Sequence, residues 1–257
     1  YFGIYQQNLP GVILAQKDEF KKLKDPLAYH YILGYNKMIT EDTKFTTEIY
    51  YKDYRNFPID PNEPEMFMID EIQYRYGFYF THPSLLDNGK ARSYGVETIV
   101  QKKLAEDFYG LASFTYFKSE YKALSGKWID RVYNNEYIVS VECGYKPSNE
   151  WEFSGRWVLA GGKPYTPFDE VKSTQMNRAV LDESKINSEK YSVYHSLNLR
   201  ADKRFHFGSS NLVVFLNIYN VYDRKNINNY FWNQNDNKKD VIYQWGLLPI
   251  FGVEYEL

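Results

Sequence analysis

Residues 136–146 read E-Y-I-V-S-V-E-C-G-Y-K, and their side chains alternate between two kinds along most of the stretch. Successive side chains of a β-strand point to opposite faces, so a period of two predicts a strand with one apolar and one mostly polar face. The apolar face is expected to carry Tyr137, Val139, Val141, Cys143 and Tyr145. The other face is expected to carry Ile138, Ser140, Glu142, Gly144 and Lys146. This stretch therefore favours a β-protein.

The same alternation recurs along the chain and ends it, with Phe251, Val253 and Tyr255 set against Gly252 and Glu254. Segments of about 9 to 15 residues suit a tilted membrane strand better than a globular strand of about 5 to 6. Ten strands are predicted, at residues 1–7, 27–38, 44–56, 91–104, 108–121, 136–146, 151–162, 190–206, 211–223 and 247–257.

The connections between these segments alternate in length. Short ones, at 39–43, 105–107, 147–150 and 207–210, are built from turn residues. Long ones lie at 8–26, 57–90, 122–135, 163–189 and 224–246. Outer-membrane barrels have this asymmetry, with short periplasmic turns and longer extracellular loops. The pattern predicts that all the long loops share one end and that Leu257 lies on the periplasmic side.

Composition agrees with an all-β chain and excludes some partners. Aromatic residues make up 19% of the chain, which favours strands over helices or disorder. A net charge of -2 gives no broad positive field, so no nucleic-acid partner is expected. The mean hydropathy of -0.58 does not exclude a membrane, because a barrel strand alternates lipid-facing and lumen-facing residues. Cys143 is the single cysteine, which excludes an internal disulfide.

We therefore predict an antiparallel, up-and-down transmembrane β-barrel of about ten strands. On this hypothesis the apolar face of 136–146 points to lipid, while Ser140, Glu142 and Lys146 turn to the lumen. The alternative is a soluble sandwich or barrel with uneven loops. Trp151 and Tyr109, next to predicted turns, add weak support for aromatic belts at the membrane interface.

Several motifs, in order along the chain, resemble the C-terminal barrel half of TonB-dependent receptors, in particular those of Bacteroidota. They are residues 29–35 (YHYILGY), 48–58 (EIYYKDYRNFP), 93–97 (SYGVE), 161–167 (GGKPYTP), 194–205 (YHSLNLRADKRF) and 217–226 (NIYNVYDRKN). The end, 247–257 (LLPIFGVEYEL), is similar to the closing strand that the barrel assembly machinery recognises. That strand usually finishes on an aromatic residue, and Leu257 departs from the pattern.

The resemblance implies a barrel of about 22 strands whose lumen is filled by an N-terminal plug. Residues 1–257 then form the C-terminal part of that barrel, and the plug, the TonB-binding box and the first strands are expected upstream of Tyr1. The strands that pair with segments 1–7 and 247–257 would then lie outside this chain, so both segments are expected to be open edges here or to pair with another chain. Hydrocarbon does not tolerate unpaired backbone groups, so each edge needs such a partner in the membrane.

No catalytic pattern stands out, so an enzyme is not expected and no cofactor is implied. The four histidines lie on separate segments without ligand spacing, which disfavours a histidine metal site. Carboxylates on predicted strands, such as Glu97, Glu142 and Asp202, are interpreted as solvated charges of the lumen.

Binding potential concentrates in the long loops, where aromatics alternate with amides and charges. Such side chains can stack on sugar or catecholate rings and hydrogen-bond their hydroxyls, or they can simply pack against neighbouring loops. The candidate ligand-binding residues are Tyr230, Phe231, Trp232 and Asn233 in one group, and Trp128, Asp130, Arg131 and Tyr133 in another.

By resemblance, the leading hypothesis is an outer-membrane receptor of a Gram-negative bacterium that takes up a scarce ligand by TonB-coupled transport. Its partners would be outer-membrane lipid, TonB through the absent plug region, and a small ligand such as a ferric siderophore, with cobalamin or an oligosaccharide as alternatives. Two other classes stay open: a porin or barrel enzyme of the outer membrane, and a soluble carbohydrate-binding β domain.

Overall fold

The structure, a computed structural model, describes residues 22–73 and 84–256. Its strands are β1 (Leu27–Met38), β2 (Thr43–Ile59), β3 (Leu86–Ala105), β4 (Phe108–Lys122), β5 (Trp128–Asp130), β6 (Tyr137–Tyr145), β7 (Trp151–Ala160), β8 (Pro164–Tyr165), β9 (Glu189–Lys190), β10 (Tyr194–Phe207), β11 (Ser210–Tyr219), β12 (Ile227–Asn233), β13 (Lys238–Tyr243) and β14 (Leu248–Glu256). The helices are η2 (Met68–Gln73), α3 (Glu170–Met176) and η3 (Glu183–Lys185).

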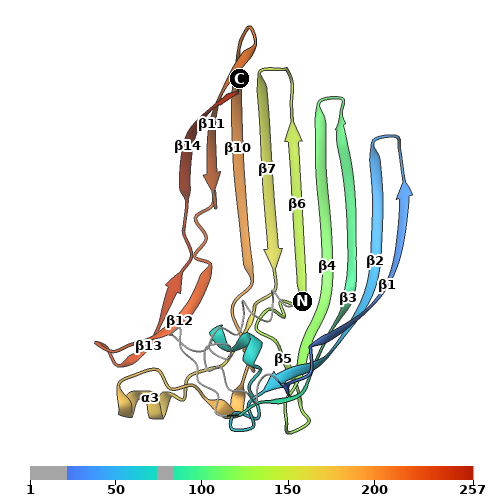
Figure 1. The fold of residues 1–257 in the computed structure, drawn as a ribbon. Helices are drawn as coiled ribbons and strands as arrows, with labels where there is room; N and C mark the ends of the chain where they lie inside the picture. Colours follow the sequence, from blue (N-terminus) through green and yellow to red (C-terminus); the bar gives the residue numbers. More distant parts are fainter. Residues whose placement is uncertain (1–21, 74–83, 257) are drawn as a thin grey trace.

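One large antiparallel sheet dominates the fold, in the order β1-β2-β3-β4-β6-β7-β10-β11-β14, with the short β5 paired to β4. Each long strand lies beside its neighbours in the sequence, which confirms the predicted up-and-down order. The sheet is strongly curved and open (Figure 1), with β1 and β14 at its two ends and no pairing between them. The predicted strand at 1–7 lies outside the described residues.

All four tight turns of the sheet lie at one end, drawn at the top of Figure 1, and the long connections lie at the other. We call these the turn end and the loop end. The last described residue, Glu256, lies at the turn end together with the β10–β11 hairpin. The predicted sorting of short and long connections is therefore confirmed for the part of the chain that the structure describes, whereas most of the predicted connection at 8–26 lies outside it.

The two faces of the sheet differ in the way that the stretch 136–146 predicts. β6 pairs with β4 and β7 without a bulge, so alternation is unbroken along it. Val141 and Tyr145 are exposed on what we call the outer face. Glu142 lies on the opposite, inner face, where its carboxylate is 2.9 Å from the guanidinium of Arg156. The register predicted for this strand is confirmed.

Strand ends differ from the prediction where side chains replace the sheet's hydrogen bonds. The strand predicted at 211–223 ends at Tyr219, because Asn220 takes a left-handed backbone conformation with φ of 49°. The Asn220 side chain donates to the carbonyls of Arg224 and Trp245 and accepts from the Arg224 N–H. The strand predicted at 190–206 likewise begins only at Tyr194.

The long connections contain more regular structure than the sequence indicated. The 163–189 connection includes α3, whose first turn is capped by the carboxylate of Asp169, 3.0 Å from the N–H of Lys172. The 224–246 connection forms the β12–β13 hairpin, and the 122–135 connection contains β5. Short-range capping and pairing therefore order these segments.

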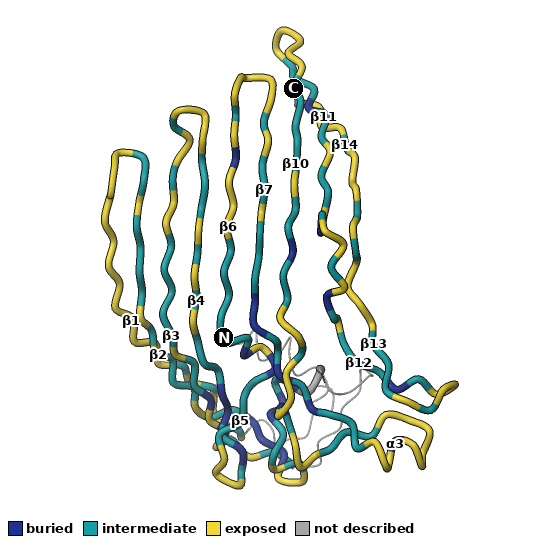
Figure 2. Tube along the Cα trace, turned by 180° about the vertical axis from the view of Figure 1, so that it is seen from behind, coloured by how far each residue is buried: buried dark blue, intermediate teal, exposed yellow. Residues whose placement is uncertain are grey.

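Most buried side chains lie at the loop end, as the dark segments of Figure 2 show. A cluster of Phe67, Ala91, Tyr121 and Ala123 forms where the segment after β2 folds onto the inner face. The Phe67 ring stacks on Tyr121 with centroids 5.0 Å apart, and the Tyr121 hydroxyl donates to the Glu65 carbonyl at 2.6 Å. This cluster anchors the segment against the wall.

Within the described part of the chain, no helix has the length and apolar character needed to cross a membrane.

Because the outer face is apolar, a charge placed on it in the middle of β4 should lower the stability of the fold. Phe114 points outward and is 44% exposed, whereas its neighbour Thr115 points inward beside Glu97. If the outer face meets lipid, as the sequence predicts, Phe114→Lys should lower the free energy of unfolding by about 2–4 kcal/mol, because a lysine near a bilayer midplane is poorly solvated. Urea unfolding of the full-length protein in phospholipid vesicles measures this. Thr115→Lys is the control, and an equal loss there would show that the faces are assigned wrongly.

Candidate functional site

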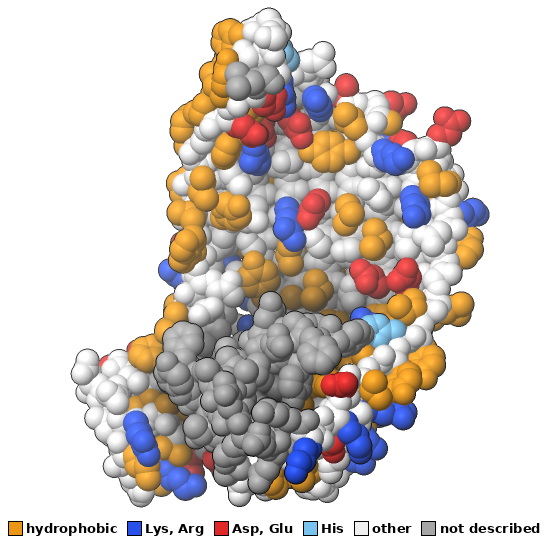
Figure 3. All heavy atoms as spheres, viewed as in Figure 1, with side chains coloured by type: hydrophobic (Ala, Val, Ile, Leu, Met, Phe, Trp, Pro, Cys, Tyr) orange, Lys and Arg blue, Asp and Glu red, His pale blue; other side chains and the backbone are white. Residues whose placement is uncertain are grey.

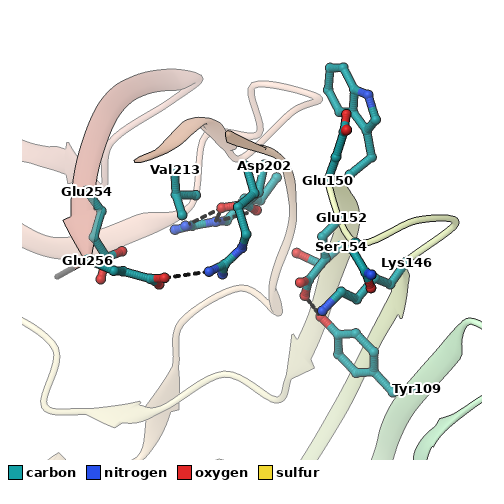
Figure 4. Close-up of a pocket in the computed structure, with 13 residues that line it drawn as sticks. Tyr109, Lys146, Glu150, Glu152, Ser154, Asp202, Val213, Glu254 and Glu256 are labelled. Carbon is teal, nitrogen blue, oxygen red and sulfur yellow. Dashed lines mark hydrogen bonds and ion pairs between the residues drawn. The ribbon is translucent and has the colours of Figure 1, made fainter. Parts of the chain in front are cut away.

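The inner face carries a charged hollow of about 370 Å³ near the turn end. Strands β4, β7, β10, β11 and β14 and the turn between β6 and β7 supply its lining, of which Figure 4 labels nine residues. Figure 3 looks onto this face and shows acidic and basic side chains next to each other at that end. The lining residues are Tyr109, Lys146, Asn149, Glu150, Trp151, Glu152, Ser154, Arg200, Asp202, Arg204, Val213, Glu254 and Glu256.

The charges of this hollow are largely paired with one another (Figure 4). Arg204 lies 2.5 Å from Glu256, and Tyr109 donates its hydroxyl to Glu152. Arg200 forms an ion pair with Asp202 at 2.6 Å and stacks on the Phe215 ring at 4.0 Å. Such pairs make a polar, hydrated wall.

The β12–β13 hairpin presents one of its faces to the 163–191 segment at the loop end. Cross-strand partners share a face, and Trp232 pairs in register with Lys239, next to the pair of Tyr230 with Val241. Tyr230, Trp232 and Lys239 therefore point to the same side of the hairpin. Four of the eight candidate residues, namely the whole first group, lie on strand β12 of this hairpin.

Tyr230 takes part in an aromatic cluster that we call the tyrosine–lysine cluster, made of Tyr165, Tyr191, Tyr230 and Lys239. The ring centroids of Tyr191 lie 4.5 Å from Tyr165 and 5.2 Å from Tyr230. The Lys239 ammonium sits 4.0 Å from the Tyr230 centroid and 3.4 Å from the Tyr165 hydroxyl. Lys239 makes no ion pair with any residue that the structure describes.

The electrostatics of this cluster favour a neutral Tyr165 beside a charged lysine. Burial raises the pKa of the Tyr165 hydroxyl, and the negative charge of Glu189 raises it further. Lysine above an aromatic face is attracted by the ring's electrons. A cation without an acidic partner, surrounded by ring faces, fits a planar anionic or aromatic ligand.

The other residues of the first group contribute to packing and to the hairpin turn. Trp232 is 8% exposed, its indole N–H donates to Asn237 at 3.1 Å, and its ring meets Phe168 edge-on at 6.0 Å. Asn233 holds the turn, because its side-chain oxygen accepts from the N–H of Asn235 at 3.0 Å. Phe231 is half-buried on the opposite face of the hairpin.

Residues of the second group lie around β5. The Arg92 guanidinium stacks on Trp128 at 4.0 Å, and Asp130 pairs with Lys118 at 2.6 Å. Tyr133 is 53% exposed. The 163–189 segment lies between this group and the hairpin. Its Asn187 donates to the Asp130 carbonyl, and its Phe168 ring contacts Trp232.

Arg131 is engaged by Asp70, which is 1% exposed. Two hydrogen bonds, of 2.6 and 3.1 Å, join the guanidinium to the carboxylate. Burial acts to lower the pKa of Arg131, but the hydrogen bonds and charge of Asp70 outweigh it and raise the pKa. Arg131 therefore fastens the 60–73 segment to the wall.

Among the described residues, no group of three or more potential ligands could hold a metal ion. His195 instead places Nδ1 2.8 Å from the Tyr222 hydroxyl oxygen.

A family model described as "TonB dependent receptor-like, beta-barrel" matches residues 22–221. The chain belongs to the TonB-dependent receptor family. No curated protein sequence matches this receptor chain significantly.

Solved structures of outer-membrane receptors share the fold of this receptor chain. The ferripyoverdine receptor of Pseudomonas aeruginosa, bound to ferripyoverdine, has a TM-score of 0.61 at 15% identity, over 93% of this chain and 28% of its own. BauA, the ferric preacinetobactin receptor of Acinetobacter baumannii, has 0.60 at 14%, over 90% and 29%. The ferric-catecholate import receptor Fiu of E. coli K12 has 0.59 at 13%, over 91% and 28%. The chain thus spans under a third of these receptors.

The sequence patterns missed Tyr165, Tyr191 and Lys239 of this receptor as members of a site. Their partners are distant in sequence, and each looks ordinary alone. One signal was present: Gly161 and Gly162 precede Pro164, and a Cβ at Gly162 would lie 1.7 Å from the Tyr191 carbonyl oxygen. Paired glycines therefore marked a close approach of two backbones.

The Asp70–Arg131 pair predicts a local loss of stability when one partner is neutralised. Asp70→Asn leaves a buried guanidinium without its charge partner, which should cost about 3 kcal/mol in the local opening of segment 60–73. Hydrogen exchange of that segment in the full-length receptor should speed up about a hundredfold. Asp236→Asn removes the partner of the exposed Lys238 and should change little. Equal exchange in both variants would contradict the structural role of Arg131.

The tyrosine–lysine cluster predicts that Tyr230 holds the hairpin against the 163–191 segment. Tyr230→Ala removes two ring contacts and one cation–π contact, so exchange in segment 163–168 should rise about tenfold. Phe231→Ala changes the opposite hairpin face and serves as the matched control. If both variants exchange alike, the packing of Tyr230 does not hold the two segments together.

Proposed function

We propose that this chain forms wall and loops of an outer-membrane receptor that takes up a scarce ligand by active transport coupled to TonB. The observation that carries the proposal is the architecture. The chain forms an open sheet of the receptor family, and in the described residues the tight turns lie at one end and the long connections at the other. In outer-membrane barrels the long connections are extracellular. The loop end then faces the medium, where ligand is captured.

In this proposal the receptor captures its ligand by non-covalent binding and does not change it chemically. Several charged residues of the inner face are paired with each other, and the loop end carries aromatic rings beside Lys239, which has no ion-pair partner among the described residues. TonB would act through a plug region outside this chain, and outer-membrane lipid would surround the outer face. Insertion by the barrel assembly machinery would depend on β14 and the residue that follows it.

The proposed ligand class is a ferric siderophore or a similar iron complex. The three receptors with the same fold are named for ferric complexes, which supports this class. Siderophore complexes combine aromatic or planar chelating groups with negative charge, which suits ring faces beside an ammonium group. We assign first contact to Tyr230 and Lys239, which share one face of the hairpin, with Tyr133 as an exposed ring of the second group.

Binding by purified full-length receptor tests the ligand class. Titration with a panel of ferric siderophores, cobalamin and oligosaccharides, followed by tryptophan fluorescence, should show saturable binding of one ferric complex. Lys239→Gln should weaken that binding about tenfold, since a desolvated cation–π and charge contact is worth about 1–2 kcal/mol.

Lys238→Gln is the matched control, because Lys238 is adjacent, exposed and already paired with Asp236. It should change the affinity less than about twofold. Saturable binding of cobalamin or an oligosaccharide alone would replace the iron complex as ligand. Equal effects of the two lysine variants would remove the tyrosine–lysine cluster from the binding site.

A further inference from the structure

The stretch of chain that leaves the wall at the end of β11 and returns to it at β14 is divided into two parts. β11 ends at Tyr219 and β14 begins at Leu248, while β12 and β13 form a separate two-stranded sheet. Residues 220–226 and 244–247 connect this hairpin to the wall, and we call them the joint (Figure 1). The first half of the joint lies in the sequence motif at 217–226, which takes no part in the proposed binding site.

The side chain of Asn226 links the joint to β10 in the way that a strand residue would. The His195 N–H donates to the Asn226 side-chain oxygen at 3.3 Å, and the Asn226 amide donates to the His195 carbonyl at 2.9 Å. Opposite residues of an antiparallel ladder exchange the same two bonds through their backbones. Asn226 is 4% exposed, so these bonds are sheltered from water. Its side chain therefore substitutes for the backbone of β11 beyond the point where that strand ends.

Asn220 and Asp223 hold the returning half of the joint. The Asn220 amide donates to the Trp245 carbonyl at 3.3 Å, and the Asp223 carboxylate accepts from the Leu247 N–H at 2.9 Å. A Cβ at Gly246 would lie 2.2 Å from the same carboxylate and would displace it. Side-chain hydrogen bonds thus tie the two halves of the joint to each other where the regular strand pairing is absent.

Arg224 connects the joint to the segment that carries Tyr191. Its guanidinium donates to the Val193 carbonyl at 3.0 Å and to the Asn226 side-chain oxygen at 3.2 Å. Val193 follows soon after Tyr191, whose ring lies 5.2 Å from the ring of Tyr230 on the hairpin. A guanidinium presents its donors in a fixed fork, so it holds both acceptors at once. The joint therefore fastens the base of the hairpin to the same segment that the face of the hairpin contacts.

We propose that Arg224 and Asn226 are positioning residues, which fix the orientation of the β12–β13 hairpin so that Tyr230 and Lys239 meet Tyr191. Tyr230 and Lys239 stand on one face of the hairpin, so a change in its orientation moves them together. Tyr191 belongs to the other segment and would be left behind. The affinity of the tyrosine–lysine cluster then depends on residues outside it, and this part of the inference rests on the proposed function.

The first measurement is the distance between spin labels on Gln234, in the exposed turn of the hairpin, and Ser209, in the β10–β11 turn. Pulsed electron spin resonance is applied to full-length receptor whose natural cysteines, Cys143 among them, are replaced by serine. The receptor with an intact joint should give one narrow distance distribution. Arg224→Lys and Asn226→Ala should broaden or shift it, because lysine lacks the fork and alanine leaves backbone groups of β10 unpaired.

Lys225→Gln and Asn228→Ala are the matched controls. Lys225 is exposed and lies between the two positioning residues, but it makes none of the bonds described above. Asn228 is exposed, and its amide donates to its neighbour Asn229. Both controls should keep the narrow distribution. An equally narrow distribution in all four variants would overturn the proposal.

Ligand affinity is the second measurement, with ferripyoverdine, ferric preacinetobactin and a ferric catecholate as probes. For a probe that binds the wild-type receptor, Arg224→Lys and Asn226→Ala should each weaken binding about tenfold, and Lys225→Gln less than about twofold. Arg224→Lys keeps the positive charge, so a loss there distinguishes positioning from direct attraction of an anion. Unchanged affinity in both variants would show that the joint does not set the binding site. If no probe binds the wild-type receptor, the proposed ligand class fails, while the spin-label distances still decide the role of the joint.

Discussion

Wherever the sheet faces lipid, each peptide N–H and C=O has to be paired with the next strand, because hydrocarbon offers no other partner. Between the two open edges, β1 and β14, the long strands meet this requirement by antiparallel pairing with their neighbours in the sequence. Regular pairing in turn fixes which side chains share a face. The apolar outer wall, the polar inner wall and the separation of turns from loops all depend on this backbone pairing.

The same strands carry paired charges on the inner face and apolar side chains on the outer face. On the inner face, charges such as Arg200 and Asp202 pair across short distances and can stay hydrated. On the outer face, apolar and aromatic side chains cover the zone from Phe108 to Tyr116, and charges return beyond it. The outward side of β4 therefore divides into an apolar part and a charged part.

The loop end is held by packing rather than by the sheet. Phe67 on Tyr121, Arg131 on Asp70, and the hairpin on the tyrosine–lysine cluster are contacts between segments distant in sequence. These contacts offset the conformational entropy that the long connections lose when they become ordered. Ligand binding at this end would use surfaces whose positions depend on those contacts, which makes them sensitive to changes away from the ligand.

The sequence by itself determined the strand pattern, the order of the strands, the sorting of turns from loops and the facing of Val141 and Glu142, because period-two alternation and turn residues act over short distances. It did not determine that Tyr165, Tyr191 and Lys239 meet Tyr230, or that Arg131 would be taken by Asp70. Those contacts join residues far apart along the chain. Only the folded arrangement brings them together, because long connections have no local period to predict their path.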